Sequence, residues 1–113
     1  MDRSTVALLV IAAFAAAGGQ LLFKVGAEGR ERLQDFINLP ILTGLCLYGI
    51  GTILWIYALS GEKLVNVYAF TALSFALVYL GGVMLLGERI TQAGAIGVAL
   101  VLAGLLLITT QKV

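Results

Sequence analysis

Four long apolar segments dominate the sequence and restrict what it can fold into. They cover residues 5–23, 39–59, 65–86 and 93–110. At 1.5 Å per residue, a helix of about 18–22 residues crosses a hydrocarbon core roughly 30 Å thick. Charged residues make up 12% of the 113 residues, whereas about 25% is usual in soluble domains. We therefore predict an all-α integral membrane protein.

Polar connections separate these segments, at residues 24–38, 60–64 and 87–92. Short connections make consecutive helices antiparallel neighbours. Helices satisfy their backbone groups in lipid without closing a barrel, and the alternation over about ten residues that marks barrel strands is not seen. We expect one four-helix transmembrane domain over residues 1–113, with both ends on one side. Asn38 and Pro40 supply a capping side chain and a first-turn proline for the second helix.

Lysine and arginine are almost balanced between the two ends of this domain, at three against four: Arg3, Lys63 and Lys112 against Lys24, Arg30, Arg32 and Arg89. Orientation normally follows an excess of these residues in cytoplasmic loops. The balance is compatible with insertion in both orientations. It is equally compatible with a weak preference that the translocon or a partner sets.

No aspartate or glutamate lies inside any apolar segment. A proton-coupled exporter of cations usually needs a carboxylate within the membrane, and the nearest acids, Glu62 and Glu88, lie in connections. No catalytic constellation is present, so we do not expect an enzyme. Histidine is absent and Cys46 is the single cysteine, so we expect no metal site, cofactor or internal disulfide. A net charge of +1 leaves no basic face for nucleic acid.

Polar and aromatic side chains recur at helical spacing inside three segments. Gln20 and Lys24 share a face because they lie four residues apart. An amide in the span needs a hydrogen-bond partner, while the lysine either contacts an anion or extends to the lipid headgroups. Two further stripes lie on the second and third segments. They are Tyr48, Thr52 and Trp55, and Tyr68, Thr71, Phe75 and Tyr79. Together they predict an amphipathic pocket, unless their Tyr and Trp residues belong to interfacial belts.

Small residues form a stripe on the fourth segment, where Gly97 and Gly104 are two helical turns apart and Gly94 lies nearby. Such a stripe suits close contact with another helix, either in a second copy or within the same bundle. The second segment repeats the pattern with Gly44 and Gly51, so packing inside the chain also needs small residues. Four short helices cannot enclose both a pathway and its walls, so we expect a dimer.

These features together resemble the drug/metabolite transporter superfamily in its small four-helix form. The resemblance is carried by residues 17–26, 67–80, 86–91 and 97–108. One branch, the small multidrug resistance family, implies a four-helix bundle that works as an antiparallel dimer. Its cavity tyrosine matches Tyr68, and its dimerising glycines match Gly97 and Gly104. Its essential first-helix glutamate falls at Ala16, and its third-helix tryptophan falls at Thr71.

The end of the first helix more closely resembles a second branch of the superfamily. This branch contains the small subunits of aminoarabinose–phosphoundecaprenol flippases and related EamA-type proteins. The match lies on Gly19, Gln20, Leu21 and Lys24. It implies movement of a polyprenyl-phosphate-linked sugar, or a similar lipid, between leaflets, with Lys24 holding the phosphate. The candidate substrate-binding residues are Gln20, Lys24, Tyr48, Trp55, Tyr68, Thr71, Ser74 and Arg89, and the candidate dimerisation residues are Gly94, Gly97 and Gly104.

The second resemblance therefore implies a lipid flippase or flippase subunit of the bacterial inner membrane. Its expected partners are membrane lipid, a lipid-linked sugar or small amphipathic substrate, and a second copy or a related four-helix subunit. Two alternatives stay open: a small multidrug resistance-like proton-coupled exporter of cationic compounds, and an accessory membrane subunit that does not transport.

Overall fold

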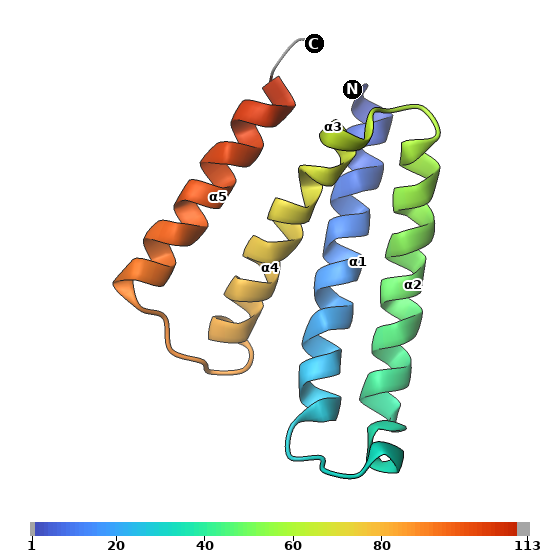
Figure 1. The fold of residues 1–113 in the computed structure, drawn as a ribbon, viewed down its shortest axis with the longest axis vertical. Helices are drawn as coiled ribbons and strands as arrows, with labels where there is room; N and C mark the ends of the chain where they lie inside the picture. Colours follow the sequence, from blue (N-terminus) through green and yellow to red (C-terminus); the bar gives the residue numbers. More distant parts are fainter. Residues whose placement is uncertain (1, 111–113) are drawn as a thin grey trace.

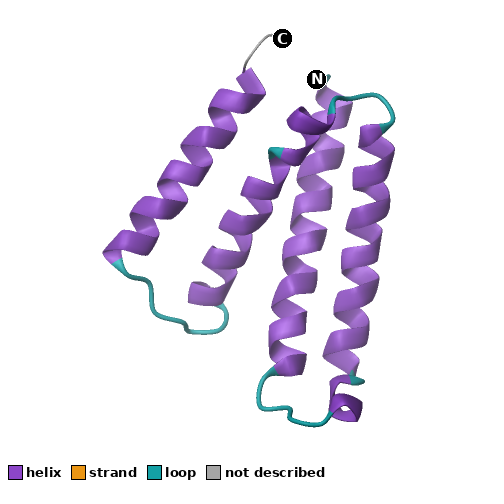
Figure 2. Cartoon of the chain, viewed as in Figure 1, coloured by secondary structure: helices purple, strands orange, loops and turns teal. Residues whose placement is uncertain are grey.

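The computed structural model describes residues 2–110, so Lys112 lies outside the described part. Within that part the chain is helical and contains no strand, as Figure 2 shows. The predicted all-α fold is confirmed, with α3 and α4 together forming the third of four helical segments. In chain order, the helices are α1 (Arg3–Ala27), the 3₁₀ helix η1 (Leu33–Phe36), α2 (Leu39–Leu59), α3 (Leu64–Tyr68), α4 (Phe70–Met84) and α5 (Gln92–Thr110).

Three of the segments are long and apolar enough to cross a membrane, namely α1, α2 and the combined stretch Leu64–Met84. The apolar stretch of α5, Gln92–Ile108, is shorter, so its crossing of the membrane stays a prediction. Consecutive segments run antiparallel, and the start of α1 lies at the same end of the molecule as the end of α5 (Figure 1).

Helix α1 extends further than the sequence predicted. It continues beyond the apolar run to Ala27, so Lys24 belongs to its last turn. The helix ends just before Gly29, whose φ of 77° is readily adopted by glycine and not by most other residues. The helix is longer than the apolar run because polar residues such as lysine are also good helix formers. The end of the apolar run therefore does not mark the end of the helix.

The third segment also differs from the expected single helix over residues 65–86. It is interrupted at Ala69, between α3 and α4, and it continues without a break through Gly81 and Gly82. Its end comes at Met84, two residues early. There the N–H of Glu88 bonds back to the carbonyl of Gly82 at 3.0 Å.

Helix α1 stands in the middle of the fold (Figure 1). It packs against α2 on one side and α4 on the other, and α5 packs against α4. The spatial order is therefore α2, α1, α4, α5, and α5 stands at the edge. A cluster of buried side chains joins α1, α2, α3 and α4 near the end of the molecule where the termini lie (Figure 1). Its members are Leu9, Ala58, Val67 and Phe70.

Glycines allow α1 and α2 to approach closely, as the sequence predicted for the second segment. A Cβ atom on Gly19 would lie 2.9 Å from the carbonyl oxygen of Gly44, and one on Gly51 would lie 3.0 Å from that of Ala12. Larger side chains at these positions would have to displace the facing backbone. This is the close packing of small residues that is typical of membrane helices.

Asn38 fixes the geometry between α1 and α2, and its predicted role as a helix cap is confirmed. Its Oδ1 accepts a hydrogen bond from the N–H of Ile41 at 3.1 Å. Its Nδ2 donates to the carbonyl of Gly26, the penultimate residue of α1, at 2.9 Å, and to that of Asp35 at 3.0 Å. One side chain therefore caps α2 and ties it to the end of α1.

Candidate functional site

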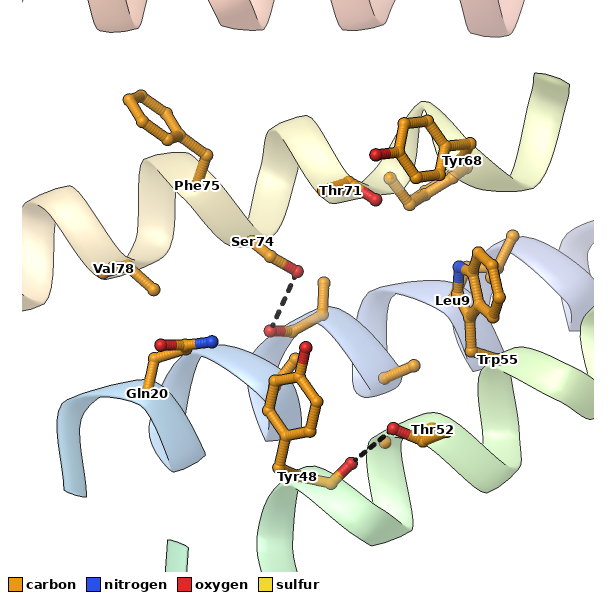
Figure 3. A pocket seen from close by; sticks show the side chains of 15 residues that line it. Leu9, Gln20, Tyr48, Thr52, Trp55, Tyr68, Thr71, Ser74, Phe75 and Val78 are labelled. Atoms are coloured by element: carbon orange, nitrogen blue, oxygen red, sulfur yellow. Dashed lines mark hydrogen bonds between the residues drawn. The ribbon is translucent and has the colours of Figure 1, made fainter. Parts of the chain in front are cut away.

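A groove with a volume of about 690 Å³ lies between α1, α2 and the α3–α4 segment. Its size is within the range of about 300–1,000 Å³ that is usual for small-molecule sites. Small residues of α1 give the groove its room, and larger side chains of the other helices form its walls (Figure 3). The α1 side consists of Leu9, Ala12, Ala13, Ala16 and Gln20.

The walls of the groove carry polar groups among mainly apolar ones. From α2 come Tyr48, Thr52 and Trp55, and from α3 and α4 come Tyr68, Thr71 and Ser74. The Thr52 hydroxyl donates to the carbonyl of Tyr48 in its own helix at 2.9 Å. The Ser74 hydroxyl points across to α1, where it donates to the carbonyl of Ala13 at 3.5 Å (Figure 3).

Gln20 differs from these hydroxyl groups because its side-chain amide makes no hydrogen bond within residues 2–110. It is exposed on α1 and lines the groove. The structure therefore supplies no internal partner for an amide that lies within an apolar span. Since such a group is costly to leave unpaired in lipid, a polar group that enters the groove is its natural partner.

Six of the eight predicted substrate-binding residues line this one groove: Gln20, Tyr48, Trp55, Tyr68, Thr71 and Ser74. The other two, Lys24 and Arg89, are not among its lining residues. Lys24 is exposed on α1, one helical turn past Gln20, and Arg89 is exposed in the connection between α4 and α5. The binding roles of all eight residues stay predictions.

Arg89 makes no ion pair with its neighbour Glu88 in the part of the chain that the structure describes. The carboxylate of Glu88 instead lies over Gly82, since a Cβ atom there would be 2.6 Å from its Oε1. Glu88 therefore does not neutralise Arg89 in the observed arrangement.

The lining carries no ionisable acid or base apart from the tyrosine hydroxyls. All fifteen lining residues are apolar, aromatic, hydroxyl-bearing or amide side chains, or glycine. Ala16 is one of them, so a glutamate at this position would face the groove. The site can bind an uncharged polar group by hydrogen bonds and by stacking on its aromatic rings, while a charged group would have to be matched from outside it.

The site prediction missed the small residues that leave the groove open, Ala12, Ala13, Ala16 and Gly51. A signal was present, because positions 12, 16 and 20 follow the spacing of one helix face. Alanines at such spacing usually indicate only helix packing. Their second role, that of leaving room, becomes visible only when the neighbouring helices are in place.

The three glycines predicted to mediate dimerisation differ in their surroundings. A Cβ atom on Gly94 would collide with the hydroxyl of Tyr79 in α4, so this glycine serves packing inside the chain. A Cβ atom on Gly97 or Gly104 would meet nothing within 4 Å. Packing within the described chain therefore does not explain the last two glycines, and their contact with another chain stays a prediction.

Comparison with known proteins supports the resemblance found in the sequence. The chain is 34% identical over 85 residues to the probable 4-amino-4-deoxy-L-arabinose-phosphoundecaprenol flippase subunit ArnF of Yersinia enterocolitica. This match covers 74% of the chain and 65% of the relative, so it spans just under two thirds of that protein.

A second relative is the probable 4-amino-4-deoxy-L-arabinose-phosphoundecaprenol flippase subunit ArnE of an Enterobacter species. It is 29% identical over 101 residues, which cover 89% of the chain and 92% of the relative. No family model matches the chain, and no solved structure matches it.

Proposed function

We propose that this chain is a subunit of a flippase that moves a polyprenyl-phosphate-linked sugar between the leaflets of a bacterial inner membrane. The observation that carries the proposal is the groove with its unpaired Gln20 amide and its hydroxyl and aromatic walls, held within helices of membrane length. Similarity to two proteins named as subunits of such flippases supports the same conclusion.

The groove suits a sugar headgroup better than a bare ion. Sugar hydroxyls both donate and accept hydrogen bonds, and Gln20, Thr71 and Ser74 supply both kinds of partner. Trp55 and Tyr68 offer aromatic faces on which the apolar face of a sugar ring can stack. A lipid-linked sugar thus has its polar part shielded from the hydrocarbon while it crosses.

Lys24 is placed to hold the phosphate next to the bound sugar. It lies four residues past Gln20 on α1, or about 6 Å along the helix axis. Its ammonium group is exposed outside the groove, near the predicted membrane surface, where an anionic phosphate would be held. In this arrangement the sugar lies in the groove, and the negatively charged phosphate lies at the end of the groove beside Lys24.

A proton-coupled exporter of cations fits this groove less well. Such a transporter needs a carboxylate that exchanges a proton for the substrate, and the lining residues include none. The position where the small multidrug resistance glutamate would fall, Ala16, lies in the groove as a methyl group.

The four helical segments act in this proposal as a single transmembrane domain that requires a partner chain. The groove is bounded by three segments, while α5 stands at the edge with Gly97 and Gly104 facing open space. A second copy, or a related four-helix subunit, would complete the transporter along this edge. Relatives that are themselves named as subunits support this part of the proposal.

The test reconstitutes the protein, with its partner where one co-purifies, in vesicles that contain a fluorescent analogue of a sugar-linked undecaprenyl phosphate. Dithionite added outside quenches only probe in the outer leaflet, so quenching of more than the outer-leaflet share reports movement of the probe across the membrane. We expect movement by the wild type, a reduction of at least tenfold for Gln20→Leu and for Lys24→Gln, and recovery for Lys24→Arg. Gly49→Ala, which faces open space on α2 outside the groove, is the matched control.

Two results would contradict the proposal. The first is wild-type protein that leaves the lipid in its original leaflet, alone and with its partner. The second is export of a quaternary ammonium compound that depends on a proton gradient, which would favour the alternative exporter.

A further inference from the structure

A second groove, with a volume of about 450 Å³, lies between the α3–α4 segment and α5. Except for the hydroxyls of Tyr68 and Thr71, its lining side chains are apolar. The lining residues from α5 are Leu100, Val101, Gly104, Leu105 and Ile108, and those from the other segment include Ala69 and Ala72. This groove was not among the sites that the sequence predicted.

The two grooves are separated by a single row of side chains. Tyr68, Thr71 and Phe75 line both of them, and they follow one another along one face at intervals of three and four residues. Figure 3 shows this row at the edge of the first groove, with α5 beyond it. A molecule can therefore extend from the polar groove, over this row, into the apolar one.

We infer that the groove between α4 and α5 holds the hydrocarbon chain of the same lipid whose headgroup occupies the first groove. The inference rests on the proposed function, because it assumes that the first groove takes a lipid headgroup. Because the phosphate joins the sugar to the chain, a chain that starts from a phosphate at Lys24 has to run back along the first groove, toward Tyr68, to reach the apolar groove. A polyprenyl chain is long enough to do so, and a chain of two prenyl units is not.

The dimensions favour a single hydrocarbon chain over a helix from another protein. The lining residues of α5 extend from Leu100 to Ile108, or about 12 Å along the helix. A helix that is 10–12 Å wide would occupy about 950–1,350 Å³ over that length, which is two to three times the volume of the groove. A helix can therefore cover the groove but cannot enter it, whereas an extended alkyl or prenyl chain is much thinner.

Small residues keep the groove open on both of its walls. Ala69 and Ala72 form part of one wall, and Gly104 belongs to the α5 wall, where an added methyl group would meet nothing within 4 Å. Because lipid tails are as apolar as these side chains, hydrophobic transfer contributes little, and a chain is held by van der Waals contact with the fixed walls of the groove. Its contribution is positional, since it holds the chain beside the headgroup that the first groove has bound.

The experiment measures binding to the purified protein, with its partner where one co-purifies, in phosphatidylcholine nanodiscs. The probes are undecaprenyl phosphate and geranyl phosphate, which share a headgroup and differ in chain length. Trp55 is the single tryptophan of the chain and lines the first groove, so its emission reports binding. We expect the wild type to prefer the long probe at least tenfold, and Gly104→Phe to reduce that preference to less than threefold.

Gly49→Phe is the matched control, because Gly49 also faces open space but lies outside both grooves. It is expected to keep the wild-type preference within twofold. Ala72→Leu, on the opposite wall, provides a second test with the same expected loss if Gly104→Phe does not fold, as judged by its circular dichroism spectrum.

Three results overturn the inference. In the first, folded Gly104→Phe and Ala72→Leu keep the wild-type preference. In the second, Gly97→Phe, which lies on the same helix but outside both grooves, loses the preference as Gly104→Phe does, so that the effect comes from contact between chains and not from the groove. In the third, the wild type moves the fluorescent lipid across vesicles but binds both probes equally, so the proposed function survives without the tail groove. Wild type that neither binds nor moves the lipid refutes the proposed function as well.

Discussion

Two adjacent glycines on α1 allow a direct test of how closely α1 and α2 pack. A methyl group on Gly19 would lie 2.9 Å from the carbonyl oxygen of Gly44, 3.0 Å from the Cβ of Tyr48 and 3.2 Å from its backbone nitrogen. A methyl group on Gly18 would meet mainly the Cδ2 of Leu47, at 2.8 Å. The first position faces backbone, and the second faces the end of a flexible side chain.

The expected free energies of unfolding follow from this difference. Both Gly→Ala changes gain about 1 kcal/mol of helix propensity, which cancels when they are compared. Gly19→Ala forces α2 away from α1, and overpacking of this kind costs about 1–3 kcal/mol. Gly18→Ala requires only a rotation of Leu47, at no more than about 1 kcal/mol. We therefore expect Gly19→Ala to be the less stable of the two by about 1.5 kcal/mol, or roughly tenfold in the unfolding equilibrium.

The assay is reversible unfolding by SDS in mixed detergent micelles, followed by circular dichroism. Gly49→Ala is the control, since a methyl group there meets nothing within 4 Å. Equal destabilisation by Gly18→Ala and Gly19→Ala would refute the close backbone approach at Gly19. Because Tyr48 lines the groove, Gly19→Ala is also expected to weaken binding of undecaprenyl phosphate, and Gly18→Ala is not.

Two further predictions concern the caps of α1 and α2. Asn38→Ala removes the cap of α2 and both bonds from Nδ2, which should lower stability by about 2 kcal/mol in the same assay. Asn38→Ser keeps a capping oxygen and should lose about half of that; equal losses would contradict the capping role, and no loss in Asn38→Ser would contradict the role of the Nδ2 bonds. The N–H of Thr5 donates to Asp2 at 2.8 Å and holds the pKa of that carboxyl below its ordinary value of 3.8. Because the folded-state pKa is lowered, the capping contribution is present above pH 3.8 and is lost as the pH falls through the lowered pKa. The amide chemical shift of Thr5 should follow this titration in the wild type and stay constant in Asp2→Asn; a titration that persists in the variant would contradict it.

Spacing predicted a large part of the groove because residues three or four apart share a face of a helix. Tyr48 and Trp55 on one segment, and Tyr68 and Thr71 on another, were expected to border a common pocket, and the structure places all four along one groove. Periodicity says nothing about which helices become neighbours. The second groove depends on α5 packing beside α4, a tertiary contact that leaves no local pattern in the sequence.

The helix ends were predicted less well, because apolar runs mark membrane burial rather than helix length. The first helix was expected to end near residue 23, but hydrogen bonding of the helix continues past Lys24 to Ala27. The interruption at Ala69 has no glycine or proline to signal it. Asn38, in contrast, was predictable, because the preference of asparagine for helix starts has a local cause in the hydrogen bond that its side chain accepts.

The properties of α1 connect packing to the proposed function. A Cβ atom on Gly51 of α2 would lie 3.0 Å from the carbonyl oxygen of Ala12 and 3.3 Å from the backbone nitrogen of Ala16, and both alanines also line the groove. Small side chains at these two positions therefore let α2 approach and keep the space beside it open. A carboxylate at position 16 would have to share this space with the substrate, whereas the methyl group leaves it to an uncharged headgroup. Within the groove, α1 keeps polarity only at Gln20, and Lys24 places a positive charge one turn beyond it. This graded helix face, from small and apolar to amide to cation, is what the proposed function requires of a helix that receives a polar headgroup in the groove and an anionic phosphate at its end.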